Sequence, residues 1–537
     1  MRVLLIEPPP NPNWMLYPHT PWVGVWMPNT GLIRIASALH KAGHQVKVAE
    51  VWAQKLSTEK LRRMIQQFQP DVVGATAITA TVYSAMSYLK FAKQVRPEAY
   101  TLIGGVHPTM APKEVISSIP EIDFAIVGEG EVTVVELVGL LEKGRVAARG
   151  AAGIAYDADG QFVKNEARPL VENLDDLGMP EHQLFSIGSR RYRFPNVGPL
   201  WLRSPAWGVE YTRGCEFDCK FCVKPVLWRM TLRYRSEEQV CDELELITRK
   251  YGVKSGQLFA NDIFARRDRL EELIIQMEKR RINYRFVTFG RADTVMENKD
   301  LLPRLVKLGL VMFWIGVESL EQDVLDHISK KTTARINKEV LKVAEEAGVP
   351  VLGPFYMMGF PEHDLKAMQS MRKEALEAIP RFSPGLPAFT PTPGTPLYYE
   401  VARKGLIEHY DYSKWDVGGA VIRTEHISSD VVNRESRKLG MRAVFRPSFV
   451  WGQLTSGTLH GFLQAFMGPA VALNMVSKRL SRVKNFLVKM VRSWFKGPDQ
   501  LEMLYEEARQ STMVYAEEAS KRVQATEPNE EATSQAP

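Results

Sequence analysis

Three of the four cysteines in this chain stand within eight residues, as Cys215, Cys219 and Cys222. The C-x3-C-x2-C spacing brings three soft thiolates together, and iron–sulfur clusters are held by such ligands. Three thiolates can hold three irons of a [4Fe–4S] cube, which leaves the fourth iron open to another ligand. Phe217 and Phe221 stand between the cysteines, where apolar rings could shield a cluster from water.

Two simpler interpretations of the triplet are a zinc knuckle and unpaired core thiols. Zinc prefers four ligands in a closed site, and no His or second Cys pair stands at suitable spacing nearby. Three cysteines in one loop are also a poor disulfide framework for 537 residues, which favours a reducing cytoplasm. The fourth cysteine, Cys241, falls in an expected helix and is interpreted as packing. The triplet therefore predicts a three-cysteine cluster.

The elements that position this loop are expected from alternating strand and helix patterns over residues 206–400. Six strand–helix units, with polar residues where strands end, predict an open (β/α)6 partial TIM barrel whose chemistry lies at the carboxyl ends of its strands. The expected strands are 207–211, 258–260, 285–289, 311–317, 351–358 and 387–390, with helices between them such as 236–250, 268–281 and 335–347.

The cysteine spacing after a strand, together with these strand ends, resembles the radical S-adenosylmethionine (SAM) enzymes. The resemblance implies that the open iron chelates the amino acid end of SAM. The reduced cluster would then cleave SAM to a 5′-deoxyadenosyl radical that abstracts hydrogen from an unreactive carbon, with electrons from an external flavodoxin- or ferredoxin-type donor. It also implies cofactor contacts: Asn261 and Asp262 near the SAM amino group, Arg291 and Glu318 at the ribose and carboxylate, and Gly359 and Pro361 beside the adenine.

Each of these contacts has a simpler alternative, since a polar residue at a strand end can also be a cap or an ion-pair partner. Asn261 departs from the acidic or glycine-rich versions that the family often has at this position.

Residues 1–145 also alternate strand and helix. Buried parallel strands separated by amphipathic helices predict a doubly wound, Rossmann-like sheet, which binds ligands at the carboxyl ends of its strands. Gly104 and Gly105 would let a ligand approach the backbone there, although glycines also simply close turns. The expected strands are 3–6, 46–48, 72–75, 100–103 and 124–127, and the expected helices are 31–42, 58–68, 82–95 and 131–142.

This pattern resembles the cobalamin-binding domain that precedes the radical domain in one large radical SAM subclass. The D-x-H-x-x-G motif that supplies a cobalt-ligating His in many cobalamin proteins is missing, so cobalamin is expected without a lower His ligand. His107 and His19 are substitutes to consider, but a lone loop His is more often a surface group. The cobalamin-lining residues implied by the resemblance are Thr76, Thr79, Gly104, Gly105, Val106, His107, Gly128, Glu129 and Gly130.

The remaining segments give weaker signals. The Pro-rich loop 8–28 carries three tryptophans that could line a cavity or cover the corrin, and simple loop packing is as good an explanation. Residues 478–496 form a basic amphipathic pattern that suits an anionic membrane surface or packing on the barrel. We expect five segments: 1–145 (cobalamin), 146–205 (connector with a hairpin), 206–400 (radical SAM barrel), 401–500 (helical extension) and 501–537 (helix and disordered tail).

Composition excludes some classes. The chain is 45% hydrophobic and 24% charged, as in ordinary globular proteins, and its net charge of +7 is modest for its length. Since no basic stripe with interleaved aromatics appears outside the C-terminal region, nucleic acid binding is not expected. The N-terminus has too few apolar residues before Glu7 for a signal peptide. A cytoplasmic enzyme is expected, with contact to the inner face of the membrane through 478–496.

The whole-chain resemblance is to the family that includes the anaerobic magnesium-protoporphyrin monomethyl ester oxidative cyclase and methylases of tetrapyrroles and hopanoids. It implies modification of an unactivated carbon on an apolar polycyclic substrate, with methyl transfer as the leading reaction. Oxidative cyclisation is the alternative within the family. A cobalamin-binding sensor or carrier with a structural cluster is the alternative outside catalysis.

Overall fold

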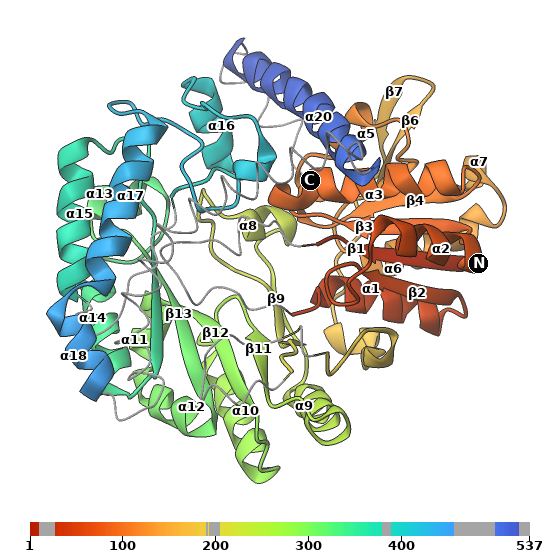
Figure 1. Ribbon diagram of the computed structural model, residues 1–537. Helices are drawn as coiled ribbons and strands as arrows, with labels where there is room; N and C mark the ends of the chain where they lie inside the picture. The colour runs from red at the N-terminus through yellow and green to blue at the C-terminus, as the bar shows by residue number, and fades with distance from the viewer. Residues whose placement is uncertain (10–26, 190–191, 193–204, 379–387, 456–499, 526–537) are drawn as a thin grey trace.

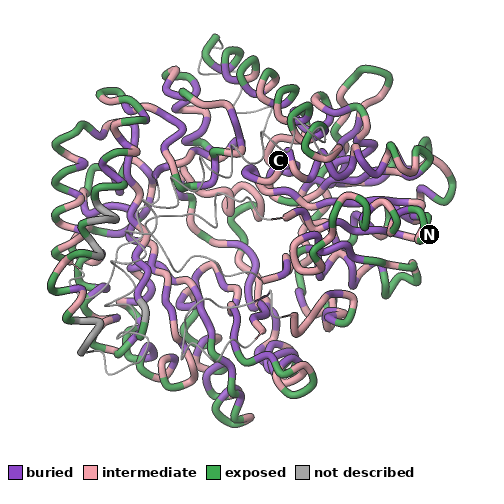
Figure 2. The backbone as a smooth tube through the Cα atoms, in the orientation of Figure 1, coloured by how far each residue is buried: buried purple, intermediate pink, exposed green. Residues whose placement is uncertain are grey.

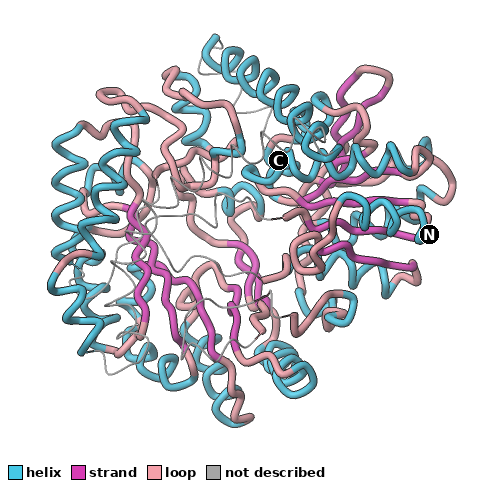
Figure 3. Tube along the Cα trace, in the orientation of Figure 1, coloured by secondary structure: helices cyan, strands magenta, loops and turns pink. Residues whose placement is uncertain are grey.

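Two α/β units lie side by side in the protein, one built from residues 1–164 and the other from residues 209–378 (Figure 1). The structure, a computed structural model, describes residues 1–9, 27–189, 192, 205–378, 388–455 and 500–525. In the first unit the strands form a central layer with helices on both faces, and in the second unit the helices lie along the outer side of the strands (Figure 3).

The first unit contains a sheet of seven strands, in the spatial order β2 (Gln45–Glu50), β1 (Arg2–Glu7), β3 (Val72–Thr76), β4 (Tyr100–Gly104), β5 (Phe124–Ile126), β6 (Ile154–Ala158) and β7 (Gln161–Lys164). The five strands expected from apolar runs all form and pair in parallel. The hairpin expected in the connector also forms, as β6 and β7. It pairs antiparallel with β5, so it extends the first sheet beyond residue 145.

Helices cover both faces of this sheet because side chains alternate along each strand. In β1, Val3 and Leu5 pack with the helices α1 (Thr30–Lys41) and α6 (Gly130–Leu141), whereas Leu4 and Ile6 pack with α2 (Thr58–Phe68) and α3 (Val82–Val95). This two-sided burial is the doubly wound arrangement that the sequence predicts. The helices of this unit are α1 (Thr30–Lys41), α2 (Thr58–Phe68), α3 (Val82–Val95), α4 (Val106–Met110), α5 (Pro112–Ser118), α6 (Gly130–Leu141) and α7 (Arg145–Ala148), with a 3-10 turn η2 (Thr79–Thr81).

The second unit contains a parallel sheet of five strands, in the order β14 (Val351–Tyr356), β13 (Leu310–Glu318), β12 (Arg285–Arg291), β11 (Ser255–Phe259) and β8 (Val209–Glu210). In place of the expected sixth strand, Ala388 forms a single parallel bridge with Met358. The helices that follow the strands are α9 (Glu237–Tyr251), α10 (Arg267–Lys279), α11 (Ala292–Glu297), α12 (Leu302–Leu308), α13 (Gln322–His327), α14 (Ala334–Glu346) and α15 (Leu365–Ala378), with η5 (Lys299–Leu301) before α12.

A short antiparallel hairpin, which the sequence does not predict, follows β8. It consists of β9 (Thr212–Gly214) and β10 (Leu232–Tyr234), and the cysteine triplet and the helix α8 (Val223–Leu227) lie between its two strands. The hairpin and α8 lie between the two sheets (Figure 1). The connector between the units contains the turns η3 (Leu174–Leu177) and η4 (His182–Leu184).

The C-terminal residues return to the first unit. The helix α20 (Gln500–Ala525) packs on α3, α5 and α16 (Pro396–Arg403) (Figure 1). Its buried side chains are mostly small and recur about every four residues. The other elements of this region are α16 (Pro396–Arg403), η6 (Tyr412–Lys414), α17 (Ser429–Val444) and α18 (Pro447–Thr455). The basic segment 478–496, the tryptophans of the Pro-rich loop, His19 and the tail 526–537 lie outside the described residues.

Burial follows the strands and the inward faces of the helices (Figure 2). Within the described ranges, no helix combines the length and apolar character needed to cross a lipid bilayer.

Candidate cofactor sites

The cysteine loop is fixed by backbone hydrogen bonds to distant elements. The amide of Lys220 donates to the carbonyl of Ile328 (3.1 Å), and the carbonyl of Lys220 accepts from Leu397 (3.0 Å). Within the loop, the amide of Cys222 donates to the carbonyl of Cys219 (3.0 Å). Cys219 is buried and the other two cysteines are half-buried, so the three thiols belong to one ordered loop.

Asn261, one of the residues expected to contact SAM, also holds the cysteine loop in place. The side-chain amide of Asn261 donates to the carbonyl of Gly214, directly before Cys215 (2.7 Å). Gly214 has φ of +89°, and a Cβ there would come within 1.7 Å of the Thr231 carbonyl oxygen. Only glycine therefore permits the close crossing at the base of the hairpin.

Positive charge surrounds the thiols. Arg291 at the end of β12 donates from Nη1 to Cys219 Sγ (3.5 Å), and its guanidinium lies 3.5 Å from the centroid of the Phe217 ring. Burial raises the pKa of Cys215, while the Phe217 backbone amide and the Lys224 charge oppose this rise. Thiolates and an anionic cluster are stabilised by such cations, so the donor set fits a cluster.

Among the described residues, no three His, Cys, Asp or Glu side chains are arranged around a single point where one metal ion could bind. A [4Fe–4S] cube does not require such an arrangement, because each thiolate binds a different iron.

Asp262 is buried behind Arg291. It accepts hydrogen bonds from the Thr294 hydroxyl (2.8 Å) and from the Phe264 amide (3.1 Å). Burial raises the pKa of Asp262 to about 6, although the Thr294 hydroxyl and the Arg291 amide lower it. Asp262 thus joins the loop after β11 to the end of β12, next to the cysteine loop.

Glu318 ends β13 in an unusual conformation, with φ of +61° beside an irregularity in the pairing with β14. Its carboxylate accepts from Lys330 Nζ (2.8 Å), and both side chains are buried. Burial alone would lower the pKa of Lys330, but the Glu318 carboxylate raises it. The carbonyl of Lys330 accepts from Arg291 Nη2 (2.5 Å), which connects Glu318 to Arg291 through Lys330.

The remaining two expected SAM residues form a neighbouring turn. Gly359 has φ of +84°, and a Cβ there would lie 2.7 Å from Val432 Cγ1. The carbonyl of Pro361 accepts from the amide of Glu425 (2.8 Å). A hydrogen bond joins this turn to the end of β13: the amide of Met357, two residues before Gly359, donates to the Glu318 carbonyl (2.9 Å).

In the first unit, the expected cobalamin residues gather at the carboxyl edge of β3, β4 and β5. Gly105 has φ of +106°, and a Cβ there would come within 2.5 Å of the Ala77 carbonyl oxygen and 2.9 Å of Thr76 Oγ1. Gly105 precedes Val106, the first residue of α4. Gly128 has φ of +88° with open space where a Cβ would stand. A ligand could approach the backbone at Gly128, which fits the predicted group, whereas at Gly105 the backbone of Ala77 fills that space.

His107 lies in α4 and is fully buried, so the expectation of an exposed loop histidine is wrong. Its Nδ1 lies 3.3 Å from Thr79 Oγ1, and its Nε2 lies 3.6 Å from Glu114 Oε1. Its ring also packs edge-on against Tyr412, at a centroid distance of 5.0 Å. Both ring nitrogens therefore face protein groups, which favours cobalamin without a lower ligand from His107.

The Glu129 side chain is also held by protein groups. Its carboxylate accepts from both terminal nitrogens of Arg233 (2.8 and 3.0 Å) and from the Val171 amide (2.8 Å). Arg213, Arg233 and Lys330 are not among the residues that the sequence pattern indicates. Arg213 could have been considered from its position two residues before Cys215. Nothing in the sequence around Lys330 indicated its contact with Glu318.

The two predicted cofactor edges meet. The helix α4, which follows the double glycine, contacts α8, which follows Cys222. Met110, at the end of α4, also lies against the loop before α16: a Cβ at Gly394 would stand 2.7 Å from Met110 Cε. The carboxyl end of the first sheet and the cysteine loop of the second unit therefore both adjoin α4.

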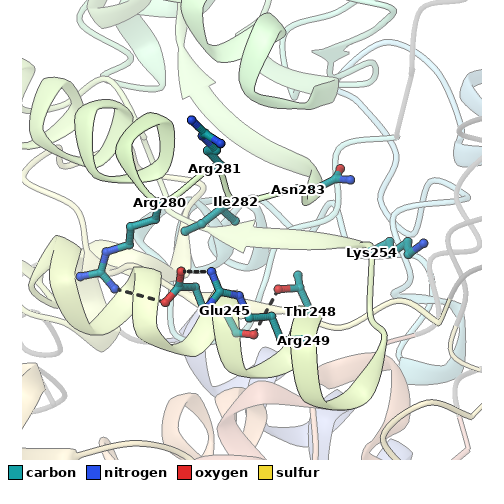
Figure 4. A pocket seen from close by; sticks show the side chains of 8 residues that line it. All are labelled: Glu245, Thr248, Arg249, Lys254, Arg280, Arg281, Ile282 and Asn283. Carbon is teal, nitrogen blue, oxygen red and sulfur yellow. Dashed lines mark hydrogen bonds and ion pairs between the residues drawn. The ribbon is translucent and has the colours of Figure 1, made fainter.

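A pocket of about 240 Å³ lies elsewhere, between the C-terminal parts of α9 and α10. It adjoins the residues before β11 and β12, and thus the end of the sheet opposite the cysteine loop. The side chains of Arg281 and Lys254 are directed to different sides of it, whereas Glu245 is paired with Arg249 and Arg280 (Figure 4). Its charged groups do not converge on a common point.

Each of the two units matches a known protein family. Residues 23–138 match the B12 binding domain family, and residues 209–375 match the radical SAM superfamily. OxsB, a cobalamin-dependent S-adenosylmethionine radical enzyme solved with aqua-cobalamin and S-adenosylmethionine bound, has the same fold. Its TM-score is 0.66 at 16% identity, covering 97% of this chain and 79% of that chain.

Three relatives are similar over most of the chain. An uncharacterized methyltransferase of Pyrococcus horikoshii is 27% identical, covering 86% of this chain and 96% of its own length. The anaerobic magnesium-protoporphyrin IX monomethyl ester cyclase of Rubrivivax gelatinosus is 28% identical, covering 87% and 82%. The hopanoid C-3 methylase of Methylococcus capsulatus is 25% identical, covering 79% and 76%.

Proposed function

Because this chain joins a B12-binding domain to a radical SAM domain, we propose that it is an enzyme that methylates an unactivated carbon of an apolar polycyclic molecule. The substrate is of the hopanoid or tetrapyrrole type. A [4Fe–4S] cluster with SAM supplies a carbon-centred radical when bound, and cobalamin supplies a methyl carrier.

The observation that carries the proposal is the contact between α4 and α8. The double glycine precedes α4, and Cys222 precedes α8, so the edges assigned to cobalamin and to the cluster share one boundary. Methyl transfer between two cofactors requires such proximity, since reacting groups must be held in a fixed geometry.

In this proposal the residues form three groups, which bind the cluster, SAM and cobalamin. Cys215, Cys219 and Cys222 hold the cluster, and Arg291 offsets its negative charge. The SAM contacts are Asn261, Asp262, Arg291, Glu318, Gly359 and Pro361. The cobalamin contacts are Thr76, Thr79, Val106, His107 and the glycines 104, 105, 128 and 130, with the backbone of Glu129.

Methyl transfer is favoured because two of the three relatives are a methyltransferase and a methylase. The second candidate is oxidative cyclisation, which the likeness to the magnesium-protoporphyrin ester cyclase supports. Both reactions act on an unactivated carbon and can use the same residues for SAM and cobalamin.

The two reactions differ in their SAM products. The protein would be reconstituted anaerobically with iron, sulfide and cobalamin, reduced, and incubated with SAM and candidate hopanoids or porphyrins. Mass spectrometry showing S-adenosylhomocysteine together with 5′-deoxyadenosine and a methylated product supports methyl transfer. Deoxyadenosine alone with a cyclised porphyrin supports the cyclase. If the parent protein forms no deoxyadenosine and the Cys215→Ala variant behaves like it, a sensor or carrier is the better assignment.

The enzyme also needs electrons for its cluster. We propose an external donor of the flavodoxin or ferredoxin type, because no second cysteine cluster that could relay electrons is present in the sequence. The test is whether reduced flavodoxin or ferredoxin replaces a chemical reductant in deoxyadenosine formation.

Peripheral contact with the inner face of the membrane is part of the proposal, because apolar substrates dissolve there. It is supported by the basic amphipathic pattern of 478–496, in which each cation near an anionic surface contributes about 1 kcal/mol. Phe445 and Trp451, which precede it, are 45% and 69% exposed.

The protein should sediment with anionic liposomes at low salt and be released as the salt concentration rises. Replacing Lys484, Lys489 and Arg492 with Glu should abolish this binding without changing iron content or SAM cleavage. Loss of solubility or cofactor in that variant would instead indicate that the segment packs on the protein.

A further inference from the structure

The hairpin β9/β10 has two arginines opposite each other at the base of the cysteine loop. Arg213 on β9 pairs in register with Arg233 on β10. Like charges directly opposite on paired strands destabilise the pairing unless counter-charges compensate. The hairpin that frames all three cysteines therefore depends on carboxylates from elsewhere.

Those carboxylates come largely from the first unit. Glu129 forms a two-pronged pair with Arg233, at 2.8 and 3.0 Å, and lies 3.4 Å from Nη1 of Arg213. Glu131, in the first turn of α6, accepts from Arg213 Nη2 (2.6 Å). Glu210 on β8 completes the set with contacts to Arg213 at 2.7 and 3.2 Å.

These side chains are almost removed from water. The side chains of Arg213, Arg233 and Glu129 are 7%, 10% and 9% exposed. Burial alone would raise the pKa of Glu129, but the hydrogen bond from Arg233 and the charge of Arg213 lower it. Buried charge pairs of this kind have strict geometry, because an unmatched charge is costly in a dry environment.

The Glu129 loop is also tied to the double-glycine loop. The amide of Gly128 donates to Thr109 Oγ1 (3.1 Å), and the Thr109 hydroxyl donates to the Gly105 carbonyl (2.8 Å). Hydrogen bonds therefore link Gly105 to Gly128, and the next residue in the chain, Glu129, is ion-paired with the two hairpin arginines.

We propose that Glu129 is a positioning residue. By holding Arg213 and Arg233 together, its carboxylate fixes the cysteine loop relative to the loops that line the cobalamin site. It acts through the hairpin and makes no contact with a reacting atom. This inference rests on the proposed function, because it assumes that both cofactors bind at these edges.

The test measures position rather than turnover. In the reconstituted protein, with the cluster reduced and cobalamin present as cob(II)alamin, both centres are paramagnetic. Pulsed EPR then gives the distribution of distances between them. The parent protein should give one narrow distribution. Glu129→Gln keeps the side-chain size but removes the charge, and should broaden or shift that distribution while iron and cobalamin remain bound.

Two further variants make the result decisive. Glu136→Gln changes a carboxylate on α6, the helix that follows Glu129, and this carboxylate pairs with Arg168 instead of the hairpin. This variant should match the parent. Arg233→Lys keeps the charge but cannot form a two-pronged pair. It should broaden the distribution, and it replaces Glu129→Gln if that variant fails to fold.

The outcomes distinguish failure of the positioning role from failure of the proposed function. An unchanged distribution in Glu129→Gln, or in Arg233→Lys where the first does not fold, overturns the positioning role. Loss of cobalamin from Glu129→Gln with an unchanged cluster signal also overturns it, since the carboxylate would then serve cobalamin directly. Failure of the parent protein to bind cobalamin or a cluster would refute the proposed function itself.

Discussion

Replacing Glu7 with Gln should reduce the pH dependence of the protein's stability. Glu7 ends β1, where its carboxylate accepts from the Asn29 amide (2.7 Å) and from the Tyr192 hydroxyl (3.0 Å). The same hydroxyl lies 2.6 Å from Glu50, so the half-buried Glu7 and the buried Glu50 share one phenol. Burial raises the pKa of Glu7 to about 7, with a further rise from the Glu50 charge and a reduction from the Asn29 amide.

The sign follows from comparing the folded and unfolded states. A pKa raised from 4.5 to about 7 means that the folded protein holds this proton more tightly than the unfolded chain does. The resulting stabilisation is fully present below pH 4.5 and is lost as the pH rises through 7. The whole shift corresponds to about 3 kcal/mol, of which about 1 kcal/mol is lost between pH 6 and pH 8.

Thermal unfolding of the reconstituted protein at pH 6, 7 and 8 tests this reasoning. The melting temperature of the parent should fall over this range more steeply than that of Glu7→Gln, which has no proton to lose at this position. Tyr192→Phe should raise the pKa of Glu7 further, because it removes a hydrogen bond that lowers this pKa. The melting temperature of this variant should therefore keep falling at higher pH than that of the parent. Equal slopes in the parent and Glu7→Gln would refute the buried-proton explanation.

Cys215→Ala should lose its iron and all SAM cleavage, whereas Cys241→Ala should keep both; iron analysis and EPR decide, and iron loss from the Cys241 variant would contradict the ligand assignment. Bound cob(II)alamin should show no nitrogen splitting from imidazole, since His107 is buried among protein groups; a splitting that disappears in His107→Ala would contradict this. Gly105→Ala should destabilise the protein by at least about 2 kcal/mol in thermal unfolding, through backbone strain and a steric clash. Gly144→Ala, at a similar φ but in open space, should cost less, and equal losses would show that the clash contributes nothing.

The parallel strands could be predicted from the sequence because each is a buried apolar run, as in Val3–Ile6 and Val72–Ala75. The hairpin β9/β10 could not, because its strands have three residues each and include two arginines. Such strands form because carboxylates of the first unit neutralise them, and that contact depends on the tertiary structure.

The residues of the candidate site could also be predicted only in part. The cysteine triplet is a local pattern, so its residues could be identified from spacing alone. Glu318 could be identified as the end of a strand, but its partner Lys330 could not, since Lys330 follows the short helix α13 and its contact with Glu318 depends on how that helix folds back. Glu129 was correctly located at a strand end, yet its role as an ion-pair partner depends on residues more than eighty positions away.

The packing of α20 on α3 has a consequence during protein synthesis. Tyr83 and Met86 on α3 contact Tyr505 and Thr512 on α20, about 400 residues later in the chain. A ribosome adds about 5–20 residues per second, so this apolar face waits roughly 20–80 seconds for its cover. During that interval the nascent first unit exposes surface that promotes aggregation, and a chaperone that shields α3 would raise the yield of folded protein.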